Sequence, residues 1–365
     1  MSLAKCQKVN ANASEFFNRP LAVKTAMLIV RRVQETDLDP LFELIQKSEF
    51  GLTTLKISKE ALESRIEKSL FAFNQKSSKP NGQPYVFVME DLKNGKIVGT
   101  CSIYSKTGGF EPLYSYEIKE SHHNSEELGV HKTIKVLHLK EEHNGPTEIG
   151  SLFLSPDYWG AGHGRLLSLS RFLFMAAFPE RFETEVIAEM RGVVDKQGRS
   201  PLWSALGSHF FQVDFPKAET LTSKSKKIIA DLMPKHSIYI PLLPEDAQEV
   251  IGKVHENTKP ALSVLEKEGF EFRDLVDIFD GGPTIHCNIP EIRAIKRSIA
   301  GTVERIEKEV KGGQQQLVSN SQLDFIACLG DTSWTKDKAT IDQVTALRLG
   351  LKVGDPVRSV SLKSE

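Results

Sequence analysis

Apolar residues recur along the chain with two periods, one typical of strands and one of helices. We expect strands in the runs rich in β-branched, aliphatic and aromatic residues at 28–33, 85–89, 97–104, 148–154, 185–190 and 270–279. Apolar residues three and four apart predict helices after Thr36-Asp37 and after Ser58, because both places carry side chains that cap helices. Residues 163–178 are mostly apolar, which predicts a helix buried on several sides. This mixture indicates an α/β protein.

The remaining segments follow these patterns less closely. Residues 105–147, rich in Gly, His and Glu, are interpreted as an insertion over the sheet. Two helices are expected at 244–254 and 260–268. The last part of the chain predicts short strands and one helix, near 315–318, 325–328, 357–362 and 341–349.

The length of 365 residues indicates more than one domain, because domains of about 100–200 residues are usual. The first convincing strand begins just after Met27, and the segment before it lacks the apolar stretch of a signal peptide. We therefore predict that residues 1–26 form an N-terminal extension.

Charge and cysteine content exclude several classes of function. The 47 basic and 48 acidic side chains nearly cancel, whereas a nucleic-acid-binding protein normally carries a basic excess. No apolar run approaches the ~20 residues of a membrane span. Cys6, Cys101, Cys287 and Cys328 show no CxxC spacing, which argues against zinc sites and disulfide frameworks. We expect a cytoplasmic protein with no metal, nucleic-acid or membrane partner.

The strongest chemical signal is the segment Trp159-Gly160-Ala161-Gly162-His163-Gly164, between an expected strand and an apolar helix. A helix N-terminus exposes unpaired N–H groups and therefore binds phosphate, and glycines let the ligand come close. The spacing fits neither a dinucleotide-binding fingerprint nor a P-loop. A tight turn is the alternative, but three alternating glycines at a helix start exceed what a turn requires.

This segment resembles the acyl-CoA loop of the GNAT N-acetyltransferase superfamily, where a strand and often a proline lead into Arg/Gln-x-x-Gly-x-Gly/Ala. The resemblance implies that the coenzyme A pyrophosphate binds the amides of Gly160, Gly162, His163 and Gly164, and that the pantetheine arm pairs with the backbone of Leu152 and Leu154. Asp157 or Trp159 stands where Arg or Gln is usual, so Arg165 or Lys140 becomes a candidate for that phosphate contact.

Two further segments, 200–207 and 257–270, resemble the C-terminal helix and following strand of the same superfamily. Two copies indicate two acetyltransferase-like halves, which we divide at residues 27–215 and 216–365. The resemblance implies that each half is a mixed, largely antiparallel sheet flanked by helices.

Longer blocks resemble the arginine N-succinyltransferase family, namely AEMRG at 188–192, MPKHSIY at 233–239, VIGKVH at 250–255 and DIFDGGPT at 277–284. The resemblance runs from about residue 28 to the C-terminus. It implies transfer of succinyl from succinyl-CoA to the α-amine of L-arginine, giving N2-succinyl-L-arginine and CoA in arginine catabolism. It also implies a homodimer or a paralogous heterodimer, with no metal or prosthetic group.

The reaction needs a base for the α-amine, whose pKa is about 8, and an acid for the leaving thiolate. The tyrosine that commonly protonates the thiolate in the superfamily is absent, since Trp203 and Leu265 stand there. The family resemblance assigns His255 as the proton donor. Glu189 and Glu148, close to strand ends, are the candidate bases, and solvated strand-end charges are the alternative interpretation.

The two substrate carboxylates require cations, and the guanidinium requires carboxylates. The candidates are Arg191, Arg199, Lys235 and His236 for the first role and Asp277 and Asp280 for the second. An ordinary turn or surface charge is the alternative for each. Two other functions also stay open. One is a related acyltransferase with ornithine as acceptor or another acyl-CoA donor, and the other is a catalytically silent acyl-CoA-binding subunit.

Overall fold

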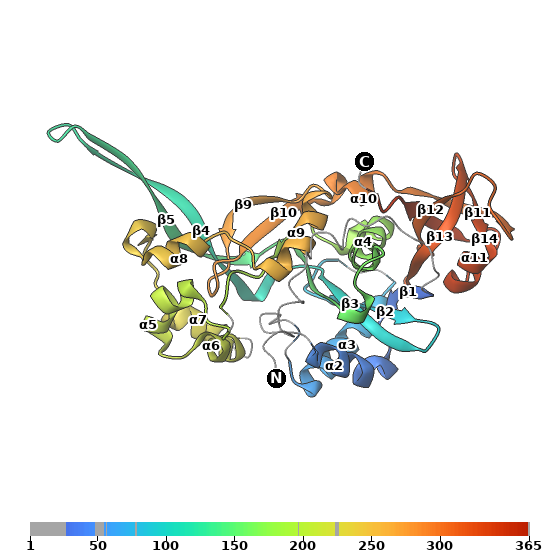
Figure 1. Cartoon of the computed structure of the whole chain (residues 1–365), viewed down its shortest axis with the longest axis horizontal. Helices are drawn as coiled ribbons and strands as arrows, with labels where there is room; N and C mark the ends of the chain where they lie inside the picture. Colours follow the sequence, from blue (N-terminus) through green and yellow to red (C-terminus); the bar gives the residue numbers. More distant parts are fainter. Residues whose placement is uncertain are drawn as a thin grey trace, which may run out of the picture.

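The computed structural model describes residues 27–47, 55, 57–76, 79–195, 197–222 and 226–363. The predicted extension at 1–26, with Cys6, lies outside the described residues. The described part is elongated, with a long β-hairpin projecting from one end and a small barrel of strands at the other (Figure 1).

The strands are linked by pairing into one sheet, which is antiparallel except at two places. They are β1 (Leu28–Arg32), β2 (Pro84–Asp91), β3 (Lys96–Tyr104), β4 (Gly108–Ser125), β5 (Val130–Asn144), β6 (Thr147–Leu154), β7 (Glu185–Glu189), β8 (Ile238–Tyr239), β9 (Glu271–Val276), β10 (Pro283–Asn288), β11 (Ile299–Glu307), β12 (Gln314–Ser319), β13 (Ile326–Thr335), β14 (Lys338–Asp342) and β15 (Pro356–Val360). The prediction of a mixed, largely antiparallel sheet is confirmed.

Helices flank this sheet, as predicted. They are α2 (Leu38–Gln46), α3 (Lys59–Asn74), α4 (His163–Ala177), α5 (Ser208–Phe211), α6 (Phe215–Thr222), α7 (Lys227–Leu232), α8 (Glu245–Val250), α9 (Lys259–Glu266), α10 (Arg293–Lys296) and α11 (Gln343–Leu349). Ser58 caps α3 by accepting a hydrogen bond from the Ala61 amide. Helix α8 ends short of residue 254 because the backbone turns to an extended conformation at Ile251 and to a positive φ at Gly252. None of the described helices is long and apolar enough to cross a membrane.

The central part of the sheet follows the order β1-β2-β3-β6, and successive residues of β2 pack on opposite faces. Val86 and Val88 join a core cluster with residues of α2 and α3. Tyr85 and Phe87 contact Phe174 of α4, with ring centroids 5.3 and 5.4 Å apart. Helix α4 is therefore buried against the face of the sheet opposite α2 and α3 from Leu166 onward, and its N-terminal residues are less buried.

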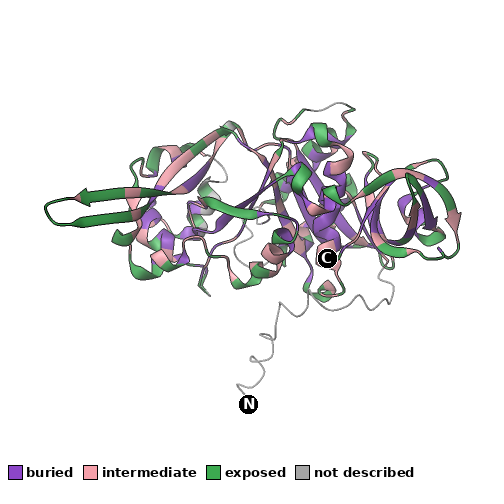
Figure 2. Ribbon diagram, turned by 90° about the horizontal axis from the view of Figure 1, so that it is seen from above, coloured by how far each residue is buried: buried purple, intermediate pink, exposed green. Residues whose placement is uncertain are grey.

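Residues 105–147 do not cover the sheet as an insertion, so that prediction is wrong. They form the β4–β5 hairpin, which joins the sheet because Tyr116 and Glu117 pair with Val276 and Leu275 of β9. Tyr116 and Leu137 are fully buried at its base, whereas the outer end of the hairpin is exposed (Figure 2). Its alternating polar residues concealed the strand pattern in the sequence.

The C-terminal strands close into a barrel, which the sequence did not predict. Strand β12 pairs with both β13 and β15, and the ring continues through β11 and β14 back to β13. Strand β13 also pairs with β1, so the barrel is attached to the central sheet. Between these parts, β7 pairs with β10 across the predicted boundary at residue 215. The division into two halves stays a prediction.

Candidate active site

The most distinctive feature of the sheet is a split between the parallel strands β6 and β7. The two strands pair only at Thr147 with Val186 and at Glu148 with Ile187. Beyond these pairs β7 continues beside β10, and β6 continues beside β3. The later part of β6, which includes the predicted residues Leu152 and Leu154, therefore has no strand on its β7 side among the described residues.

A bulge in β6 marks the place where the strands part. Register with β3 shifts between Thr100 and Ser102, and Ser151 takes a φ of 52°. Behind the bulge lies Arg171 of α4, which is 1% exposed and donates to the carbonyl of Gly150 at 3.5 Å. The split is thus supported from the core side by a buried guanidinium.

The glycine loop follows β6 directly and opens α4. Gly160, Ala161 and Gly162 have φ values of 95°, 48° and 80°, and Gly162 is the N-cap of α4. The Trp159 indole donates to the carbonyl of Leu154 at 2.9 Å, which folds the loop back onto the end of the strand. The amides of Gly160 and Gly162 donate to no group in the described part of the chain, so they are available to a ligand.

The other predicted phosphate contacts, apart from the Gly164 amide, are already engaged. The His163 amide donates to the Gly160 carbonyl at 3.1 Å, and its Nδ1 lies 2.9 Å from the Tyr158 carbonyl. Arg165 donates to the carbonyl of Leu362, and Lys140 pairs with Glu142 away from this loop. Their assignment to phosphate stays a prediction, and the free amides of the two glycines are the better supported part of it.

Glu148 and Glu189 lie at the split, on β6 and β7 respectively. Desolvation by surrounding protein raises the pKa of the Glu148 carboxyl, although Lys226 and Arg65 favour its charged form. Desolvation, and then repulsion from Glu148 and Asp277, raise the pKa of Glu189 well above its usual value. Solvent still reaches the Glu189 side chain, because it lines an open depression. A carboxylate of this kind suits proton abstraction near neutral pH.

Asp277 and Asp280 hold the turn between β9 and β10. Asp277 Oδ1 accepts from the amides of Phe279 and Asp280, and this turn ends β9 at Val276. Asp280 accepts from the amides of Gly192 and Gly282 at 2.7 and 2.8 Å. Desolvation and the neighbouring Asp277 raise the pKa of Asp280 to about 8. These bonds explain both residues as turn residues, and their contact with a guanidinium stays a prediction.

His255 lies close to the end of β7 through backbone contacts. Its amide donates to the Arg191 carbonyl at 2.9 Å, and Gly192 bridges with Val254. Its Nδ1 accepts from the Asn257 amide at 3.2 Å, so the ring caps the short 3-10 turn Glu256–Thr258. His255 and Arg191 are therefore brought together, next to the strand that carries Glu189.

The other predicted cations, Arg199, Lys235 and His236, are exposed. Arg199 pairs with Asp195 at 2.7 Å, which explains it as a surface charge. Lys235 and His236 lie in the connection between α7 and β8. A role for these three in binding the substrate stays a prediction.

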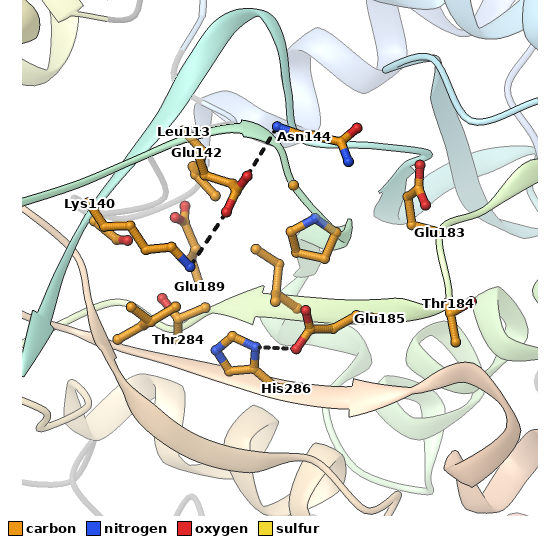
Figure 3. A pocket seen from close by; sticks show the side chains of 15 residues that line it. Leu113, Lys140, Glu142, Asn144, Glu183, Thr184, Glu185, Glu189, Thr284 and His286 are labelled. Carbon is orange, nitrogen blue, oxygen red and sulfur yellow. Dashed lines mark hydrogen bonds and ion pairs between the residues drawn. The ribbon is translucent and has the colours of Figure 1, made fainter.

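A cavity of about 260 Å³ lies between β7 and β10 on one side and the base of the β4–β5 hairpin on the other (Figure 3). Glu189 lines it, together with Glu185, Glu142, Lys140 and His286. Among these residues, only Glu189 and Lys140 are predicted from the sequence. Glu185 on β7 and His286 on β10 are ordinary members of the alternating pattern of their strands. The face that they share becomes a cavity only because the β4–β5 hairpin folds over β7.

A split pair of parallel strands that leads to a glycine-lined helix N-terminus, with a carboxylate of raised pKa at the split, defines a class of protein. Its geometry is suited to transfer of an acyl group from coenzyme A to an amine. Within the described residues, no group of three or more His, Cys, Asp or Glu side chains is arranged to hold a metal ion.

Comparison with known proteins identifies the family. The model of the arginine N-succinyltransferase beta subunit matches residues 28–294, and the model of its C-terminal domain matches residues 300–361, which contain most of the barrel. An arginine N-succinyltransferase of Enterobacter sp. (strain 638) is 42% identical over 93% of this chain and 99% of its own length. One from Escherichia coli (strain 55989 / EAEC) is also 42% identical, over the same shares.

A solved structure agrees with these matches. The arginine/ornithine succinyltransferase subunit AI from Pseudomonas aeruginosa is 35% identical and superposes with a TM-score of 0.84, over 93% of this chain and 100% of that one. The chain therefore belongs to the arginine N-succinyltransferase family.

Proposed function

We propose that the protein transfers succinyl from succinyl-CoA to the α-amine of L-arginine, giving N2-succinyl-L-arginine and CoA in arginine catabolism. The observation that supports this proposal best is the split between β6 and β7. The glycine loop follows β6 on one side of the split, and Glu189 lies on β7 at the other. A donor arm in the split would present its thioester close to a carboxylate suited to act as a base.

On the donor side, the N-terminus of α4 provides the positive end of a helix dipole for the coenzyme A pyrophosphate. The free amides of Gly160 and Gly162 support this assignment, and Gly164 and His163 complete the predicted set. The pantetheine arm pairs with the open edge of β6 at Leu152 and Leu154, in the way that a strand would.

The chemistry follows in three steps. Glu189, or Glu148 beside it, takes a proton from the α-ammonium group of the acceptor. The free amine attacks the thioester carbonyl carbon. As the tetrahedral intermediate breaks its carbon–sulfur bond, the nitrogen releases its second proton to solvent, which leaves a neutral amide. His255, when protonated on both ring nitrogens, donates a proton from Nε2 to the leaving thiolate. This step requires Nδ1 to give up the Asn257 amide, from which it accepts in this structure.

For the acceptor, the sequence proposes Arg191 and His236 at carboxylates and Asp277 and Asp280 at the guanidinium. Arg191 is the most favourably placed of the four, because its carbonyl accepts the His255 amide beside the end of β7. Asp277 supports this region in another way, since its charge contributes to the raised pKa of Glu189.

The test is release of free thiol from purified protein, with succinyl-CoA or acetyl-CoA as donor and L-arginine or L-ornithine as acceptor. The proposal expects turnover with succinyl-CoA and arginine to exceed turnover with the other pairs. Faster release with ornithine would favour the related acyltransferase, since the Pseudomonas relative is described as an arginine/ornithine succinyltransferase. Coenzyme binding without thiol release in every combination would instead indicate a silent subunit.

We further propose that the protein works in the cytoplasm as a homodimer or a paralogous heterodimer. The family model and the Pseudomonas relative are both described as subunits. The three described cysteines, Cys101, Cys287 and Cys328, are buried free thiols, as expected in a reducing compartment. Light scattering of the purified chain would measure the mass, and a monomer at micromolar concentration would contradict the homodimer.

A further inference from the structure

We propose that the cavity between β7 and the β4–β5 hairpin binds the amino-acid acceptor, with Lys140 at its α-carboxylate and Glu185 at its guanidinium. This inference rests on the proposed function. It gives Lys140 and Glu185 the roles that the sequence predicts for Arg191, His236, Asp277 and Asp280, because only the first two line the cavity. The cavity volume of about 260 Å³ is slightly below the ~300–1,000 Å³ of typical small-molecule sites, as suits a single amino acid.

The charges that line the cavity complement those of arginine. Four glutamates, Glu142, Glu183, Glu185 and Glu189, line it together with one lysine, Lys140. Arginine carries two cations, the α-ammonium and guanidinium groups, and one anion, the α-carboxylate. A cavity with carboxylates toward both ends and a single lysine therefore matches this substrate better than it matches a succinyl group or a phosphate.

The spacing along β7 matches the length of arginine. Glu185 and Glu189 lie on the same face of the strand, four residues apart, which is about 13 Å at ~3.3 Å per residue. An extended arginine measures about 7 Å from its α-nitrogen to its guanidinium carbon, from bonds of about 1.5 Å. Hydrogen bonds of about 3 Å at each end complete the span. Ile187, between the two glutamates and 1% exposed, provides an apolar floor for the three methylene groups.

Strand pairing places Lys140 toward the Glu189 end of the cavity. Lys140 pairs with Ser115, whose neighbour Tyr116 pairs with β9 at Val276. The adjacent residue of β9, Leu275, pairs with Thr284, and Thr284 pairs with Glu189. Lys140 and Glu189 lie toward one side of the cavity in Figure 3, and Glu185 lies toward the other. A carboxylate at Lys140 would thus place the α-amine beside the candidate base.

His286 provides an independent sign of a ligand with hydrogen-bond donors. Its side chain lines the cavity and is 6% exposed, and its Nδ1 lies 3.1 Å from Glu185 Oε1. Among the described residues, its Nε2 has no hydrogen-bond partner. Burial lowers the pKa of His286, so the ring is neutral at neutral pH. If Nδ1–H donates to Glu185, then Nε2 is an acceptor, which suits a guanidinium and not an anion.

The present partners of these residues are exchangeable. Lys140 Nζ lies 3.5 Å from Glu142, and Arg273 lies 3.3 Å from Glu185 Oε1, in pairs whose side chains are about one-third or more exposed. Solvent-exposed ion pairs of this kind contribute little, so a substrate can replace them. Oε2 of Glu185 has no partner within the described part of the chain.

The experiment compares Glu185→Gln with Glu271→Gln. Both glutamates pair with Arg273, but only Glu185 lines the cavity, so the second variant is a matched control. We expect Glu185→Gln to raise the KM for arginine roughly tenfold to a hundredfold, because a charged hydrogen bond is lost. The KM for ornithine, whose side-chain cation reaches less far along β7, should rise less, and the KM for succinyl-CoA should not change.

Lys140→Met tests the other end, with Lys132→Met on the exposed outer hairpin as its control. Calorimetry should show weaker binding of L-arginine to Lys140→Met but unchanged binding of agmatine, which lacks the carboxylate.

Unchanged arginine affinity in both Glu185→Gln and Lys140→Met would overturn the inference, and so would equal losses in the controls. Wild-type protein that binds arginine in calorimetry but releases no thiol would refute only the proposed function. No binding of arginine would refute both.

Discussion

Replacement of Gly162 by valine tests whether the N-terminus of α4 binds the coenzyme. Gly162 is the N-cap of this helix and has a φ of 80°. Left-handed backbone costs an L-residue about 1–2 kcal/mol, and a β-branched side chain tolerates it least. The valine variant therefore either keeps the backbone with this strain or relaxes the loop, and relaxation turns the free amides of Gly160 and Gly162 away from the ligand.

The expected loss of donor affinity follows from these amides. A hydrogen bond from a backbone amide to a charged phosphate contributes about 1.5–3 kcal/mol, and 1.4 kcal/mol corresponds to a tenfold change in affinity. Loss of one such bond should raise the KM for succinyl-CoA roughly tenfold to a hundredfold. The KM for arginine should stay close to that of the wild type, because no residue of the glycine loop lines the acceptor cavity.

Gly350→Val is the matched control for this measurement. Gly350 ends α11 with a φ of 65°, and a Cβ there would meet nothing within 4 Å. Valine at Gly350 therefore imposes similar backbone strain in the barrel, away from the glycine loop. Thermal unfolding should show a comparable loss of stability in both variants, whereas steady-state assays should show a changed KM only for Gly162→Val. An unchanged donor KM in Gly162→Val would remove the loop from the coenzyme site.

Three further outcomes follow from the structure. His255→Ala should lower kcat by about 10²–10⁴-fold while calorimetry shows normal coenzyme A binding, and a near-normal kcat would exclude it as the acid. Glu189→Gln should lose turnover yet unfold at a higher temperature than the wild type at pH 8. The raised pKa of Glu189 means that folding binds its proton, so the wild type loses stability as pH rises from about 4 toward the folded pKa. Equal melting temperatures at pH 8 would contradict this. Gly282→Ala should lower the free energy of unfolding by about 3 kcal/mol or more in urea, because its Cβ would lie 2.0 Å from the Met190 carbonyl and 2.5 Å from the Gly192 amide. A wild-type midpoint would refute that reasoning.

In the acceptor cavity that we propose, Glu185 takes the guanidinium role that the sequence predicts for Asp277 and Asp280 at the β9–β10 turn. Asp277 and Asp280 precede Gly281-Gly282-Pro283 and look like a cluster of acids at a turn. Their oxygens accept hydrogen bonds from backbone amides. These bonds hold the turn together and tie it to the end of β7. The same turn brings Asp277 near Glu189, so it acts on the site through the pKa of another group.

The sequence by itself determined the local structure and the glycine loop. Short-range physics decides both, since a strand followed by alternating glycines and an apolar helix produces an exposed helix N-terminus wherever the segment lies. The sequence also placed Glu148 and Glu189 on separate strands, and the helix and strand periods predicted the mixed fold.

Only the tertiary structure decided the rest. The split between β6 and β7 depends on which strands pair, and that pairing joins residues about forty positions apart in the chain. The acceptor cavity depends on the β4–β5 hairpin, whose polar alternation hides the strands until β9 pairs with them. The raised pKa of Glu189 depends on protein and charges brought around it from β6 and the β9–β10 turn. Burial and proximity across the chain set all three, and neither is a property of the local sequence.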